Sequence, residues 1–87
     1  MNAVVINVTF TDVSAARAEL DQLVPQVSAA PGFVAGYWIS LSADKGTSVV
    51  VFDSAESAQG LVAMLGAAPA MTVTVDSVEV GEVLAHA

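Results

Sequence analysis

The chain has 87 residues, of which 55% are hydrophobic, 13% charged and 6% aromatic, as is typical of one small globular domain. Nine acidic side chains stand against two basic ones, Arg17 and Lys45, so the net charge is −7 and no surface that neutralises nucleic-acid phosphates can be assembled. The lack of cysteine excludes disulfides, thiolate catalysis and cysteine-based metal sites.

The N-terminal segment lacks the positively charged side chains with which a signal peptide begins. No apolar stretch approaches the roughly 18 residues that a membrane span needs. We therefore expect residues 1–87 to form one cytoplasmic domain that has neither a membrane nor a nucleic acid as its partner.

A β-branched run over residues 3–10 predicts the first strand. Successive side chains of a strand point to opposite faces, so this strand has one apolar face and one mixed face. The apolar face carries Val4, Ile6, Val8 and Phe10, and the mixed face carries Val5, Asn7 and Thr9.

A helix is predicted next, capped by Thr11 or Asp12 and running to about Ala29. Arg17 is expected to point away from its apolar stripe. Pro25 removes one backbone donor, so we expect it to kink the helix or to split it in two. The stripe itself consists of Val13, Ala16, Leu20, Leu23, Val24 and Val27.

A hairpin follows the Pro-Gly turn at residues 31–32. Its first strand is predicted over Phe33 to Ala43, its turn at residues 44–46 and its second strand over Thr47 to Phe52. The two strands are antiparallel to each other.

A second helix is predicted from the N-cap Ser54 to the segment 66–69, and a long final strand from Thr72 to Ala85. The apolar positions of the final strand change parity around residues 76–77. A β-bulge at that point would bring both halves of the strand onto the same face.

The predicted order of elements, β-α-β-β-α-β, is that of a ferredoxin-like α+β fold with a four-stranded antiparallel sheet and two helices on one face. Two helices cover only one face of such a sheet, yet the strands carry apolar side chains on both. We therefore expect a second copy of the chain to cover the open face, giving a homodimeric α+β barrel.

Three stretches carry a resemblance to a known family: the run from Ala30 to Trp38, the run from Ser48 to Phe52, and Ser54 to Ala58 at the start of the second helix. Together they resemble the dimeric α+β barrel superfamily, including its antibiotic biosynthesis monooxygenase-like members, over nearly the whole chain. That superfamily contains oxygenases, haem-degrading enzymes and dismutases, so the resemblance implies the fold and leaves the activity open.

Five residues are the candidate ligand-binding set: Val5, Asn7, Thr9, Tyr37 and Trp38. An amide in the middle of a strand is costly to bury without a hydrogen bond, and the resemblance implies that Asn7 orients a substrate or an oxygen species. Tyr37 and Trp38 are adjacent, so only one of them can line a site. These three are the candidate catalytic residues. The alternatives are a structural amide for Asn7 and packing or dimer contacts for the aromatic pair.

No cofactor and no metal is expected. The haem-degrading branch of the superfamily implies a histidine ligand on a helix, whereas the second predicted helix has none and the only histidine, His86, is next to the last residue. The glycine spacing matches no nucleotide-binding loop, and the acidic side chains form no cluster at metal-ligand spacing.

Two functions remain open after the sequence alone. The first is a homodimer that binds a small apolar or aromatic ligand between its sheets or has a filled interior, and the alternative is a cofactor-independent, monooxygenase-like enzyme acting on an aromatic or polycyclic substrate. A module that binds proteins through its acidic surface ranks third. An open cavity next to Asn7 and an aromatic side chain would favour binding or catalysis over a filled scaffold.

Overall fold

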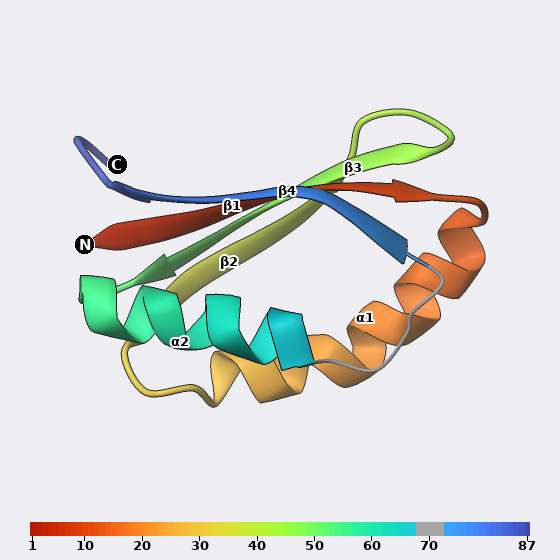
Figure 1. Cartoon of the computed structure of the whole chain (residues 1–87). Coiled ribbons are helices and arrows are strands. Elements are labelled where there is room, and N and C mark those ends of the chain that lie inside the picture. Colours follow the sequence, from red (N-terminus) through yellow and green to blue (C-terminus); the bar gives the residue numbers. More distant parts are fainter. Residues whose placement is uncertain (68–72) are drawn as a thin grey trace.

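The computed structural model describes residues 1–67 and 73–87. Its four strands form one antiparallel sheet in the order β2-β3-β1-β4, and both helices lie on the same face of that sheet (Figure 1). The predicted ferredoxin-like α+β fold is therefore confirmed. In chain order the elements are β1 (Asn2–Phe10), α1 (Val13–Ser28), β2 (Phe33–Ser40), β3 (Lys45–Phe52), α2 (Ala55–Ala67) and β4 (Val73–Glu82).

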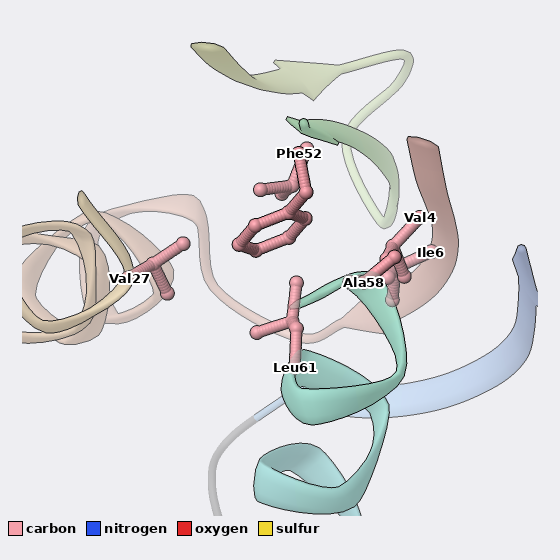
Figure 2. Packing of buried hydrophobic residues seen from close by; sticks show 7 residues of the cluster. Val4, Ile6, Val27, Phe52, Ala58 and Leu61 are labelled. Atoms are coloured by element: carbon pink, nitrogen blue, oxygen red, sulfur yellow. The ribbon is translucent and has the colours of Figure 1, made fainter. Parts of the chain in front are cut away.

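The core lies between the helices and one end of the sheet. Val50 and Phe52 of β3 are 1% and 0% exposed, and Val27 of α1 and Leu61 of α2 point toward Phe52 (Figure 2). The Phe52 ring also meets Phe33 edge to face, with centroids 6.2 Å apart. Each such side chain contributes roughly 1.5–3 kcal/mol when fully buried. Alternate residues of β1 and β3 thus supply the apolar face that the strand pattern predicts.

Both helix starts are capped as the sequence predicts. Asp12 Oδ1 accepts a hydrogen bond from the backbone N–H of Ser14 at 2.8 Å, and Ser54 Oγ accepts one from the N–H of Ser57 at 3.2 Å. Each cap satisfies a backbone donor that the first helical turn leaves without a partner. No helix in the described part of the chain is long and apolar enough to cross a bilayer.

Pro25 does not split α1, which is one continuous helix from Val13 to Ser28. The proline stands in the last turn, where its missing N–H removes only the bond to the carbonyl of Asp21. Asp21 is exposed, so water can hydrate that carbonyl, and the helix still closes with a bond from Ala29 N to Pro25 O at 3.2 Å.

The hairpin turn lies earlier than the sequence predicted. β2 ends at Ser40 rather than at Ala43, and β3 begins at Lys45. The Lys45 carbonyl accepts hydrogen bonds from the backbone N–H groups of Leu41 and Ser42, at 2.9 and 3.2 Å. Gly46 is therefore a strand residue opposite Ser40. A Cβ there would lie 3.0 Å from Cε1 of Phe10, so this glycine permits close packing rather than a turn.

The predicted bulge in β4 is present. Asn7 lies opposite Ser77 and the next residue of β1 lies opposite Val75, so Asp76 is the extra residue. β4 ends at Glu82 rather than at Ala85 because the ladder has by then reached the first residue of β1. The expected end of the second helix within 66–69 and start of the final strand at Thr72 fall partly or wholly outside the described residues.

Candidate functional site

A cavity of about 240 Å³ lies between α1 and the helix-covered face of the sheet. All four strands contribute to its floor. Its walls are mostly aliphatic, with Ile6 and Val8 from β1, Leu20 and Leu23 from α1, and Val75 from β4. The volume approaches the lower end of the range of about 300–1,000 Å³ that encloses drug-sized ligands, so the cavity suits a smaller molecule.

Small side chains on facing elements create this space. On the helix-covered face of β3, Val50 and Phe52 fill the core at one end of the strand. At the other end Gly46 and Ser48 have small side chains, which leave space above the sheet. Ala16 of α1 also lines the cavity. Gly46, Ser48 and Ala16 have small side chains, so they fill little of the space between the helix and the sheet.

Trp38 forms the aromatic wall of the cavity. It lies on the helix-covered face of β2, directly opposite Ser48 of β3. Its indole ring lies over Gly36, where an added Cβ would be 2.7 Å from Cη2 and 2.8 Å from Cζ3. Gly36 therefore supplies the room that the ring occupies, and a larger residue would move the ring.

Few polar groups reach the cavity. Ser48 is only 8% exposed, and its hydroxyl makes no hydrogen bond with any residue in the described parts of the chain. Arg17 and Glu19 of α1 also line the cavity. Arg17 is exposed, as expected of a residue off the apolar stripe, but it also borders the cavity, since it follows Val13 by about one helical turn and has a long side chain.

The structure separates the candidate residues predicted from sequence. Trp38 lines the cavity, whereas Val5, Asn7, Thr9 and Tyr37 belong to the opposite, open face of the sheet. Tyr37 is 62% exposed there. The adjacent aromatic residues thus lie on opposite faces, as predicted, and the cavity lies on the side of the sheet away from Asn7.

The polar side chains of the open face are bonded to one another. Asn7 Nδ2 donates to Ser77 Oγ at 2.9 Å, across the pair of strands that holds the bulge. The Thr9 hydroxyl donates to Asp76 Oδ2 at 2.6 Å and accepts from Lys45 Nζ at 2.9 Å. The alternative that Asn7 has a structural role requires its amide to be hydrogen-bonded, and the bond to Ser77 meets this requirement.

Ser48 is a cavity residue that the sequence analysis missed, although the sequence holds a signal for it. Ser48 has the same strand parity as Val50 and Phe52, so it is a polar residue at a core position of an otherwise valine-rich strand. A polar side chain at a core position is informative because burial without a partner is unfavourable.

No family model and no curated protein matches the chain, but solved structures do. The haem degrader MhuD from Mycobacterium tuberculosis, with two haems bound in its active site, is similar over 98% of both chains, at 18% identity and a TM-score of 0.58. The chain shares the fold of MhuD. An arginine-to-serine variant of MhuD, with two manganese protoporphyrin IX molecules per active site, matches 98% of this chain and 97% of its own at 21% identity and a TM-score of 0.57.

The cavity does not fit a haem of the kind that MhuD holds. Haem iron in proteins is held by histidine, cysteine, methionine or tyrosine side chains, and the described residues that line the cavity include none of these. His86 stands in the exposed tail beyond β4. A volume of about 240 Å³ is also below that of sites for drug-sized ligands, and a porphyrin is a large ligand of that class.

Proposed function

We propose that the protein binds a small, largely apolar aromatic molecule in the cavity between α1 and the sheet. The observation that carries this proposal is the cavity of about 240 Å³ with aliphatic walls and the single tryptophan, Trp38, on one side. An apolar cavity of about 150 Å³ is enough to take up benzene. The larger volume suits a fused pair of aromatic rings, and Trp38 offers a flat surface against which such rings stack.

The shared fold supports this assignment at the level of ligand shape. MhuD holds flat aromatic macrocycles in its active site. The proposed ligand is flat and aromatic too but smaller, because Ala16, Gly46 and Ser48 open only a modest volume.

Each binding unit is proposed to be one half of a homodimer in which the open sheet faces pack against each other. Tyr37 and Ile39 are 62% and 46% exposed on that face, and Val5, Val49 and Val51 beside them are half-buried. An apolar sheet face of this kind is unfavourable in water, and a two-fold axis allows the same face to cover itself. Sedimentation velocity should then give about twice the chain mass of 8.8 kDa, and a monomer would contradict the dimer.

In this dimer the open-face members of the candidate set contact the partner chain rather than the ligand. Val5 and Tyr37 contribute apolar area, and Asn7 and Thr9 are already bonded within their own sheet. Trp38 remains as the aromatic contact of the ligand.

Filling the cavity tests the binding proposal. Ala16→Leu places a larger side chain in the cavity, whereas Ala18→Leu adds the same side chain at an exposed position of the same helix. Calorimetric titration with methyl 1-naphthoate, a neutral fused-ring probe, should give a dissociation constant below about 1 mM for the native chain and for Ala18→Leu. Ala16→Leu should not bind. Equal binding by both variants, or no binding of either this ester or its parent acid, 1-naphthoate, by the native chain, would contradict the proposal.

A cofactor-independent, monooxygenase-like reaction is the second candidate. It is favoured by the placement of Trp38 in a cavity of a fold that MhuD uses for haem degradation. An oxygen electrode tests it directly, with 1-naphthol as the substrate and Ala16→Leu as the control. Oxygen uptake that the native chain supports and the variant does not would favour the enzyme, and no uptake despite binding would favour a binding protein.

A further inference from the structure

We infer that the cavity selects aromatic carboxylates, with Arg17 binding the carboxylate and Ser48 binding a second polar atom of the ligand. This inference rests on the proposed function, since it concerns the ligand of the same cavity. The apolar walls of the cavity select a ligand only by its size and shape, and the inference adds that the ligand carries a negative charge and a second polar group.

Arg17 borders the cavity from an exposed position on α1. The chain has two such residues and a net charge of −7, and Arg17 is the one that lines the cavity. Its guanidinium forms neither an ion pair nor a hydrogen bond with residues 1–67 or 73–87. Lys45, by contrast, donates to Thr9 Oγ1 at 2.9 Å on the other face of the sheet. An arginine without a partner beside an apolar cavity is suited to a planar anion, which it can bind through two parallel hydrogen bonds.

Glu19 also lines the cavity and bears on the charge of the ligand. Residues two apart on a helix do not face each other, so Glu19 and Arg17 border different parts of the cavity. Glu19 has an interaction partner of its own. The anionic group of the ligand is therefore expected at the Arg17 side.

Ser48 supplies an independent observation. It is 92% buried at the floor of the cavity, and its hydroxyl has no hydrogen-bond partner in the described chain. A hydroxyl on a residue that is so little exposed normally has a partner in the protein or in ordered water. Trp38 is its direct neighbour across β2 and β3. A ring that stacks on Trp38 would bring its polar substituent within reach of this hydroxyl.

A matched pair of probes separates charge from shape. 1-Naphthoate and methyl 1-naphthoate share the fused ring and differ in charge. The native chain should bind the acid at least about fivefold more tightly than the ester. Arg17→Gln should weaken binding of 1-naphthoate by about fivefold to tenfold and leave binding of the ester unchanged. Lys45→Gln removes the same charge from the opposite face and should change neither affinity.

Ser48→Ala gives a second measurement that does not depend on Arg17. It should weaken binding of 4-hydroxy-1-naphthoate, which carries a hydroxyl besides the carboxylate, by about threefold and leave binding of 1-naphthoate unchanged. The melting temperature should stay the same, since no bond within the protein is lost. Equal binding of 4-hydroxy-1-naphthoate by Ser48→Ala and the native chain would overturn the role of Ser48. Circular dichroism of each variant checks that it is folded.

The outcomes distinguish the inference from the function on which it rests. If the ester binds the native chain as tightly as the acid, or if Arg17→Gln and Lys45→Gln behave alike, the inference is overturned while the binding function stands. If neither probe binds the native chain, the proposed function fails and the inference fails with it.

Discussion

The two faces of the sheet differ in how their polar groups are satisfied. On the open face the Asn7 amide bonds to Ser77, and the Thr9 hydroxyl bonds to Asp76 and Lys45. On the helix-covered face the Ser48 hydroxyl has no partner in the described chain, although the residue is only 8% exposed. The polar groups of the open face are already hydrogen-bonded, so that face needs only an apolar surface to cover it. The hydroxyl in the cavity can still donate a hydrogen bond to a ligand or accept one from it.

The largest expected effect comes from placing a charge on the helix-covered face. Val50 is 1% exposed in the core, so Val50→Lys would bury an ammonium group without a partner. We expect a loss of more than about 4 kcal/mol in the free energy of unfolding, enough to unfold most of a domain of this size. Urea denaturation followed by circular dichroism measures this loss. If the free energy of unfolding of Val50→Lys were within about 1 kcal/mol of that of the native chain, the helix-covered face would not be the buried one.

The same substitution one residue earlier should act on assembly instead of folding. Val49 lies between Val5 and Tyr37 on the open face. Val49→Lys should cost less than about 1 kcal/mol within one chain but dissociate the proposed dimer, because in it two like charges would meet across the two-fold axis. Sedimentation velocity should show a folded monomer. Met64→Lys, at an exposed position of α2, should remain a dimer. A dimeric Val49→Lys variant would place the interface elsewhere.

A smaller effect is expected where the indole ring of Trp38 lies over Gly36. Gly36→Ala brings a methyl group to 2.7 Å from Cη2, so the ring must move, at a cost of about 1–3 kcal/mol. The emission maximum of Trp38, the only tryptophan, should shift. Gly81→Ala is the control, since a Cβ there meets nothing within 4 Å. Unchanged emission in Gly36→Ala would show that the ring does not depend on the glycine.

The smallest effects compare two hydroxyl groups on opposite faces. Thr9→Val removes a hydroxyl with two partners and should lower the free energy of unfolding by about 1 kcal/mol. Ser48→Ala removes one without a partner in the described chain and should change it by less than about 0.5 kcal/mol. Thermal unfolding of both variants at one protein concentration measures the difference. A larger loss for Ser48→Ala would mean that its hydroxyl is bonded within the protein.

The order of the elements and the parity of the strands could be predicted from sequence because both are local properties. Alternating valines set the two faces of β1, and the parity change near Asp76 indicated the bulge before any pairing was known. The hairpin turn could not be located as well, because Gly46 looks like a turn residue and is a packing residue. Its role depends on Phe10, a contact distant in the chain.

The cavity could be predicted only in part. Trp38 was predicted as a site residue from sequence, but in one site with Asn7, which lies on the other face. The volume lies between α1 and the sheet, with Ala16 and Ser48 among its lining, and no local pattern gives the relative placement of these two elements. Arg17 was missed because a long side chain at the border of a stripe can turn toward it.

The position of the ligand can be measured directly by NMR with two side chains as reporters. Trp38, whose indole N–H gives its own signal, lines the cavity, and the side-chain amide of Asn7 lies on the open face. When 1-naphthoate is added to ¹⁵N-labelled protein, the Trp38 indole signal should shift to saturation while the Asn7 amide signals stay in place. A shift at Asn7 with no change at Trp38 would contradict the account, since it would place the ligand between the sheets and leave the cavity without a role.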